Sequence, residues 1–228
     1  MQKFNTHGIV LARTNYAEAD RIITFLTPTH GKVKAMAKGV RKSKSKLAGG
    51  IELFSVSELS FMVGKSEINT LISSRLVKHY GQIVKDLNRT NSAYDFIKRL
   101  DKATAEAPEE AYFNLLKQSF EALNDDSISL ELVNAWFGAQ LLKLAGRAPN
   151  LRTTKAGSKL EEGQSYKFDF DSMSFEPGKS YTSGHIKLLR LLSSSTEPLQ
   201  INKVLGIDQL ISKVLGLVNQ ISSLQTGL

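Results

Sequence analysis

The sequence predicts an α+β protein, in which a small β-barrel of five strands precedes an α-helical bundle domain. Three observations predict this class. Short strand-like segments separated by turn residues fill the first eighty positions, and apolar residues recur at helical spacing beyond them. A segment rich in Gly and Pro then interrupts the helical pattern at about residues 146–181. We therefore expect one domain over residues 1–80 and a second over residues 81–228, with a β-hairpin insertion at about 146–181.

The expected strands lie between Gly, Pro, Asn and Ser residues that favour turns. They are Thr6–Arg13, Arg21–Thr27, Lys32–Lys38, Leu53–Val63 and Ile68–His79. Between the second and third strands, Pro28 and Gly31 suit a tight reversal, so these two strands should form a hairpin. Five short strands with no long helix between them favour a closed barrel, because closure removes exposed strand edges. An OB-fold is the barrel that we expect.

The third expected strand has two different faces. Small apolar residues alternate there with a largely cationic set, Lys32, Lys34, Met36 and Lys38. Alternate residues of a strand point to opposite sides of the sheet. One face should therefore pack inside the barrel while the other presents positive charge.

The remainder of the chain reads mainly as helices. Apolar residues at spacings of three and four predict three amphipathic helices before residue 145, with breaks at Ala107–Pro108 and Asn124–Ser127. Aromatic and polar residues alternate over Tyr166–Glu176, which predicts the β-hairpin of the insertion. Helical spacing resumes at Ile186 and again at Ile207, so two further helices should complete the bundle.

Composition excludes several classes of protein. The chain has no cysteine and only four histidines, which leaves no thiolate ligand or nucleophile and few metal ligands. No apolar run is long enough to span a membrane, and the polar start Met1–Asn5 does not resemble a signal peptide, so we expect a cytoplasmic protein without membrane contact. We find no arrangement typical of a catalytic or cofactor site and predict neither enzymatic activity nor a cofactor.

Two short motifs have ordinary explanations. Pro177–Ser180 resembles the end of a phosphate-binding loop but lacks the earlier Gly, and we interpret it as a turn. Asp169 and Asp171 share a face of a predicted strand, but no third ligand lies nearby in the sequence. We interpret this acidic pair as a solvated hairpin face.

The net charge of +8 is concentrated at one end of the chain. Of the 30 Lys and Arg and the 22 Asp and Glu residues, the first 50 positions hold ten and two respectively, so the other 178 positions are balanced. Lys38–Lys46 alone places five cations among nine residues, separated by Ser, Gly and Val. Most charge runs are merely solvated surface, but this one adjoins a cationic strand, which favours phosphate contact.

The predicted nucleic-acid-binding residues are therefore cations of this region, with one aromatic side chain. Tyr16, Phe25, Phe54 and Phe61 could each stack on a base. A buried core position is an equal or better interpretation for the three Phe residues, whereas Tyr16 lies in a polar turn. The predicted set is Lys32, Lys34, Lys38, Arg41, Lys42, Lys44, Lys46 and Tyr16.

Four consecutive segments of the barrel region resemble the amino-terminal domain of the bacterial RecO family in order and spacing. They are His7–Leu11, Tyr16–Ile23, Phe25–Lys32 and Ala37–Leu47. Beyond them, Gly146–Leu151 is similar to the family segment that leads into a zinc module.

The resemblance implies an OB-fold mediator of DNA repair and recombination that binds single- and double-stranded DNA and anneals complementary strands. It implies work with RecR to load RecA on strands coated by single-stranded DNA-binding protein. The family's DNA contacts lie on the basic barrel, so Lys34, Lys38 and the cations up to Lys46 inherit that role. Glu18 and Asp20 match family positions, and we expect them to fix a turn. The alternatives are an RNA-binding or ribosome-associated OB-fold protein, and a protein-interaction scaffold.

Two further expectations follow from the resemblance. The family's zinc module uses paired cysteines, but Thr154 and Gly157 stand where the first pair would be, so we expect no zinc and an insertion held by aromatic packing. The acidic tail of single-stranded DNA-binding protein should dock on the helical domain in an apolar pocket with cations at its rim. Available cations are Arg99, Lys102, Lys117, Lys143 and Arg147.

Overall fold

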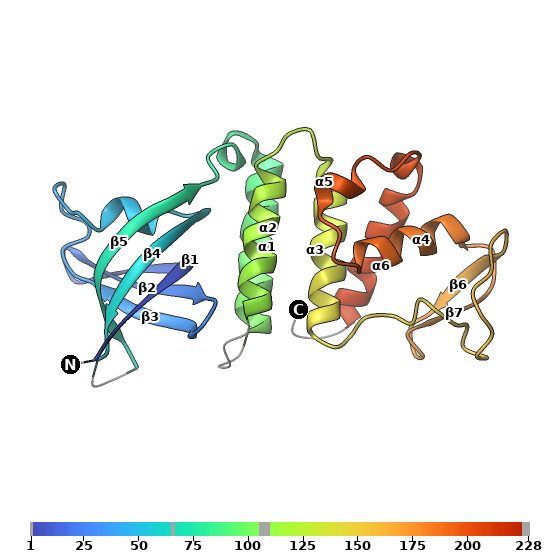
Figure 1. Ribbon diagram of the computed structural model, residues 1–228, viewed down its shortest axis with the longest axis horizontal. Coiled ribbons are helices and arrows are strands. Elements are labelled where there is room, and N and C mark those ends of the chain that lie inside the picture. The colour runs from blue at the N-terminus through green and yellow to red at the C-terminus, as the bar shows by residue number, and fades with distance from the viewer. Residues whose placement is uncertain (1, 65–66, 105–109, 225–228) are drawn as a thin grey trace. The chain divides into compact units, whose positions relative to one another are not determined.

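A computed structural model describes residues 2–64, 67–104 and 110–224 (Figure 1). It divides the chain into two compact units, residues 1–124 and 125–228. The predicted α+β class is confirmed, with a five-stranded barrel first, helices after it and a β-hairpin in the second unit. The first two helices belong to the same unit as the barrel. The domain boundary expected at residue 80 stays a prediction.

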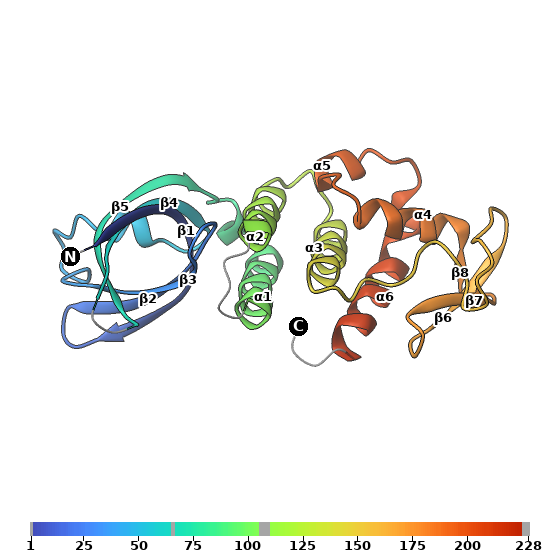
Figure 2. The ribbon, with the colours of Figure 1, turned by 60° about the horizontal axis from the view of Figure 1, so that its bottom comes forward.

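Five antiparallel or parallel pairings close the barrel in the order β1-β2-β3-β5-β4, the strand order of an OB-fold (Figures 1 and 2). The strands are β1 (Lys3–Tyr16), β2 (Asp20–Thr27), β3 (Gly31–Ala37), β4 (Ser55–Met62) and β5 (Asn69–His79). A 3₁₀ turn, η1 (Ala48–Ile51), lies between β3 and β4. All five strands match the expected segments within a few residues at each end.

The long strand β1 makes closure possible because it pairs with two neighbours. Its first half pairs with β4 and its second half with β2, and a bulge between Val10 and Ala12 bends the strand between them. The parallel pairing of β3 with β5 closes the opposite side. Gly8 of β1 packs closely on the barrel core, because a Cβ there would lie 2.5 Å from Leu59 Cδ1 and the Leu59 side chain would have to shift.

The barrel has an interior core and a second apolar layer outside it. Val33, Ala35 and Ala37 of β3 are buried in the interior cluster, as the alternation predicted. Outside that cluster, Ile9, Leu26 and Val56 are also buried and lie in register across β2, β1 and β4.

The two helices of the first unit lie side by side next to the barrel (Figures 1 and 2). A 3₁₀ turn, η2 (Ile83–Lys85), leads into α1 (Leu87–Ala103), and α2 (Glu110–Leu123) follows. Asp86 caps α1 by accepting from the Arg89 N–H at 2.9 Å. Phe120 of α2 makes edge contact with Phe54, with ring centroids 5.6 Å apart, so the helices pack on the barrel through aromatic rings. The helix break expected at Ala107–Pro108 lies outside the described residues.

The second unit is a group of helices with a small sheet. Its elements are α3 (Leu130–Leu144), β6 (Ser165–Asp169), β7 (Ser174–Pro177), β8 (Tyr181–Thr182), α4 (Ser183–Leu192), α5 (Pro198–Ile201), η3 (Ile207–Gln209) and α6 (Ile211–Leu224). Helix α3 is buried on most of its surface and contacts α4 and α6. Ser129 caps α3 through the Leu132 N–H at 3.2 Å.

The sheet of the second unit has the strand order β7-β6-β8. Strands β6 and β7 form the predicted hairpin, with Phe168 opposite Phe175. Among the described residues, no helix combines the length and the apolar character that crossing a membrane requires.

Candidate nucleic-acid interface

The basic segment, which we define as Lys38–Lys46, is an exposed loop directly after β3. Its five cationic side chains, those of Lys38, Arg41, Lys42, Lys44 and Lys46, are all exposed. Two backbone turns shape it, since the Lys42 N–H donates to the Gly39 carbonyl at 3.1 Å and the Ser45 N–H to the Lys42 carbonyl at 3.0 Å. The structure thus brings together five of the seven cations predicted from the sequence.

One residue of the basic segment points inward. Val40 is 4% exposed and belongs to the interior cluster of the barrel. The loop is therefore fastened to the hydrophobic core near its beginning, while the cations around Val40 stay in solvent.

The turn between β1 and β2 also contacts the basic segment. The Asp20 carboxylate accepts a hydrogen bond from the Gly39 N–H at 2.7 Å, and the Ala19 carbonyl accepts from the Arg41 N–H at 2.9 Å. Glu18 and Ala19 line an open hollow together with Arg41 and Lys42. Asp20 fixes this junction, as expected from its position, whereas the exposed Glu18 side chain faces the hollow.

The cations of β3 divide into two kinds. Lys34 is exposed on the outer face of the barrel. Lys32 instead donates to the Asp101 carbonyl at 2.8 Å and to its carboxylate at 3.2 Å, both on α1. Within the first unit Lys32 thus joins barrel to helix, and the structure does not group it with the other predicted cations.

The aromatic candidates separate by burial. Phe25, Phe54 and Phe61 are at most 2% exposed and fill the core, whereas Tyr16 is 52% exposed. Tyr16 lies opposite Asp20 in the β1–β2 register, next to the junction with the basic segment. Of the four aromatic candidates, Tyr16 is accessible for base stacking.

The same outer face carries two apolar residues: Met36, which the alternation of β3 placed there, and Ile22, which sequence reasoning missed. Ile22 lies opposite Thr14 on one side and Met36 on the other, and Ile22 and Met36 are half-buried. The signal was available, because Ile22 directly precedes the core residue Ile23 and so must point outward. These side chains place an apolar strip between Tyr16 and the exposed Lys34.

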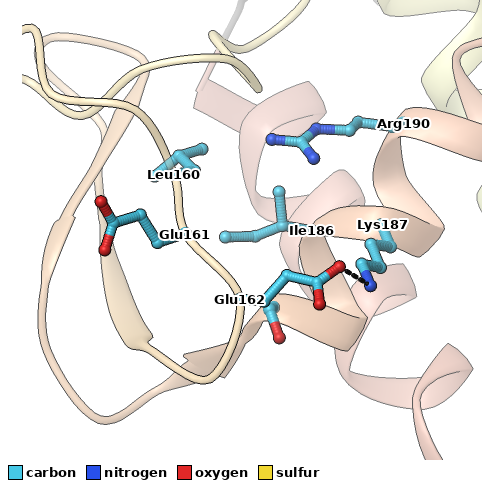
Figure 3. Close-up of a pocket in the computed structure, with 7 residues that line it drawn as sticks. Leu160, Glu161, Glu162, Ile186, Lys187 and Arg190 are labelled. Carbon is cyan, nitrogen blue, oxygen red and sulfur yellow. Dashed lines mark ion pairs between the residues drawn. The ribbon is translucent and has the colours of Figure 1, made fainter.

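The second unit has an apolar hollow at α4 and the segment that follows α5. The residues that line it are Gly184, Lys187, Leu188, Leu191, Val204, Ile207 and Leu210. Lys187 is the cation at this hollow, and it was not among those proposed from the sequence. Lys187 Nζ lies 2.5 Å from Glu162, at the neighbouring hollow between α4 and the insertion (Figure 3).

None of the cations proposed from the sequence is among the residues that line this hollow. Arg99, Lys102 and Lys117 belong to the first unit, so they do not share a unit with that hollow. The Arg99 side chain is only 14% exposed beside Asp95, and burial lowers the pKa of its guanidinium. In the second unit, Lys143 donates to the Ser193 carbonyl at 2.9 Å, which closes the end of α4.

Aromatic side chains pack together at the insertion. Phe175 is fully buried, with ring centroids 5.0 Å from Phe168, 5.9 Å from Tyr181 and 6.5 Å from Tyr166. The residues at the family's first cysteine pair form a turn, in which the Gly157 N–H donates to the Thr154 carbonyl at 2.9 Å. Over residues 2–64, 67–104 and 110–224, no group of three or more His, Asp or Glu side chains is arranged to hold a metal ion.

A carboxylate at the hairpin turn has an altered pKa. Asp169 accepts from Lys155 Nζ at 2.5 Å and from the Ser172 hydroxyl at 3.0 Å, and these contacts lower its pKa to about 2. Asp169 therefore stabilises the turn through these contacts. Its side chain is only 13% exposed and Asp171 lies in the turn beyond the end of β6, so the predicted solvated face shared by the two carboxylates is wrong.

These features define a class of protein: a closed OB-fold barrel with an exposed basic segment, followed by a helical unit. Family models described as Recombination protein O N terminal and Recombination protein O C terminal match residues 1–80 and 85–227. The chain belongs to the RecO family, which confirms the resemblance, here in a cysteine-free member.

Curated relatives agree with this assignment. The chain is 38% identical over 149 residues to the DNA repair protein RecO of Moorella thermoacetica. The aligned region covers 65% of this chain and 55% of that protein. The chain is also 38% identical over 153 residues to the DNA repair protein RecO of Dehalococcoides mccartyi, covering 65% and 58%. For Desulfatibacillum aliphaticivorans the values are 32% over 154 residues, 66% and 60%. The matched part of the chain thus spans less than two thirds of each relative's length.

Proposed function

We propose that this protein is a mediator of DNA repair and homologous recombination that binds single- and double-stranded DNA. The observation that carries the proposal is the exposed basic segment on an OB-fold barrel, in a chain of the RecO family. The relatives' name, DNA repair protein RecO, supports the choice of DNA as the ligand.

The proposed mechanism is electrostatic. Lys34, Lys38 and the other cations of the basic segment would neutralise phosphates and release their counterions, which provides affinity without base readout. Tyr16 and the adjoining apolar strip would give unpaired bases a surface to stack on. Two complementary strands could then approach with reduced repulsion and anneal, with no covalent change to either strand.

We further propose that the protein works with RecR to load RecA on strands coated by single-stranded DNA-binding protein. The apolar hollow at α4 suits the phenylalanine end of that protein's acidic tail, because leucine and isoleucine side chains line it and Lys187 supplies a cation. A tail carboxylate would compete with Glu162 for Lys187. Lys187→Ala should therefore weaken binding of a labelled tail peptide, and Glu162→Ala should strengthen it; equal affinities for both variants would contradict this site.

Salt dependence tests the DNA-binding proposal directly. If about five phosphates are contacted, the logarithm of the affinity for a single strand should fall with the logarithm of salt concentration at a slope of about −3.5. Fluorescence anisotropy with a labelled oligonucleotide measures this slope, and a slope near zero would refute the proposal.

Strand annealing and nucleic acid choice complete the test. Complementary strands coated with single-stranded DNA-binding protein should anneal faster when the protein is added. Parallel titrations with DNA and RNA of one sequence address the RNA-binding alternative, since a clear preference for RNA would point to recognition of the 2′-hydroxyl.

A further inference from the structure

Asp20 is an acidic residue in the middle of a cationic surface, and it begins β2 immediately after the β1–β2 turn. Its carboxylate accepts the Gly39 N–H at 2.7 Å, a short distance for this type of bond. Gly39 has a left-handed backbone, with φ of 63°, at the point where the chain leaves β3 and enters the basic segment. The hydrogen bond therefore holds Gly39, whose backbone conformation sets the direction in which the basic segment leaves β3.

The contacts of the next residues depend on the same junction. The Arg41 N–H donates to the Ala19 carbonyl at 2.9 Å, and the Arg41 guanidinium donates to the Ala17 carbonyl at 3.4 Å. Val40 lies between these contacts and is buried in the barrel core. The three successive residues Gly39–Arg41 are thus each held in place. The positions of the cations after them depend on this fixed stretch.

Coulomb's law and this geometry make opposite predictions for Asp20. A carboxylate close to bound phosphates should repel them, so its removal should strengthen binding. A carboxylate that orders the phosphate-binding loop before it meets the ligand should instead promote binding, because less conformational entropy is lost on association. Asp20 is half-buried and bonded to the loop backbone, which favours the second effect.

We propose that Asp20 is a positioning residue of the nucleic-acid interface, which raises affinity despite its charge because it holds the basic segment in its binding conformation. The inference rests on the proposed function, because it requires that the basic segment bind phosphates. The ligand class is a single- or double-stranded nucleic acid backbone.

Two variants of equal charge separate the two effects. Asp20→Asn and Asp20→Ala both remove one negative charge, but the asparagine carbonyl can still accept from the Gly39 N–H. We expect Asp20→Asn to bind a labelled oligothymidine at least as tightly as the parent protein. Asp20→Ala should bind more weakly than the parent protein and about fivefold more weakly than Asp20→Asn, with a shallower salt slope, because the cations no longer act together.

Glu18 provides the matched control in the same turn. Its side chain is exposed, and the hydrogen bonds described above between this turn and the basic segment involve Ala17, Ala19 and Asp20 instead. Glu18→Ala and Glu18→Gln should therefore bind alike, and both should match or exceed the affinity of the parent protein.

Hydrogen exchange gives a readout that binding affinity does not. The Gly39 amide should exchange faster in Asp20→Ala than in the parent protein, and Asp20→Asn should restore its protection. Equal affinity and salt slope for Asp20→Ala and Asp20→Asn would overturn the inference, even if their melting temperatures differed. A parent protein without salt-dependent binding would instead refute the proposed function, and the inference with it.

Discussion

The basic segment Lys38–Lys46 follows β3 of the barrel, and the insertion at residues 146–181 joins α3 to α4, but different interactions hold these two stretches in place. The basic segment is fastened by Val40 in the barrel core and by hydrogen bonds from its backbone N–H groups to the Asp20 carboxylate and the Ala19 carbonyl. The insertion is held by a cluster of aromatic rings around the fully buried Phe175. The anchoring of the basic segment leaves its cations in solvent, whereas the packing of the insertion buries apolar surface.

Binding charge and folding stability therefore come from different parts of the chain. Removing exposed cations deletes little buried area, so it should change binding and hardly change folding. Removing a buried ring creates a cavity, so it should change folding and leave the basic segment intact. Substitutions in each part, a change of pH and removal of metal can test this division.

The largest effect should come from the aromatic cluster. Phe175→Ala should lower the free energy of unfolding of the second unit by about 3–5 kcal/mol, because a buried ring is lost and a cavity remains. Trp136, the only tryptophan, is buried in α3, so its fluorescence follows the unfolding of this unit in denaturant. Lys167→Ala on the exposed side of the same sheet is the control and should change stability little. An equally small effect of Phe175→Ala would show that the cluster does not hold the insertion.

The second effect concerns the basic segment. Replacing Arg41, Lys42, Lys44 and Lys46 together by Ala should weaken single-strand binding by on the order of a hundredfold at 0.1 M salt and flatten the salt slope. Lys32→Ala is the informative control, since Lys32 is engaged by Asp101 and should contribute less to binding. If the quadruple substitution left the salt slope unchanged, the basic segment would not be the DNA-binding surface.

A smaller, pH-dependent effect should come from His185, where the insertion leads into α4. Its Nδ1 accepts from the Thr182 N–H at 3.1 Å, which requires an unprotonated Nδ1, and burial, with a lesser effect of Lys213, lowers its pKa. As pH falls, the unfolded chain takes up this proton first, near pH 6.5. The stabilisation is therefore complete above that pH and is lost below it. Thermal unfolding at pH 7.5 and 5.5 should show this loss, and His185→Gln, which keeps an acceptor, should reduce it.

The smallest effect should follow metal removal. Because aromatic packing occupies the insertion, a chelator should leave the melting temperature of the second unit unchanged, and metal analysis of protein grown with zinc should return no bound equivalent. One equivalent of zinc, or a melting temperature that falls on chelation, would show that a metal ion helps to hold the insertion.

Local patterns in the sequence were sufficient for much of the fold. Alternation with period two and turn residues located all five barrel strands, and the spacing of buried residues such as Phe96 and Leu100 located α1. The predicted cations from Lys34 to Lys46 are exposed, because charged side chains stay hydrated unless they find a partner. Lys32 has such a partner in Asp101, on a helix far away in the sequence, and no local sequence pattern could reveal this contact.

The same residues also adopt different structures in different surroundings. Ile201–Gly206 and Ile211–Gly216 share the pattern I-x-K-V-L-G, but Gly206 ends the first in a left-handed turn whereas the second lies within α6. Val204 is 43% exposed, whereas Val214 at the same position of the second copy is fully buried. Helix propensity does not distinguish these copies, because propensity is a weak preference that packing overrides.

The α+β class, the barrel strands, the location of the charge and the lack of cysteine ligands could all be predicted, because each follows from residue type or short-range spacing. Which residues act together became evident from the tertiary structure alone. It joined Asp20 to Gly39, Lys32 to Asp101 and Phe175 to Tyr181, and it placed Lys187 at an apolar hollow. Contacts of this kind depend on where the chain returns in space, which the long-range packing of the core sets.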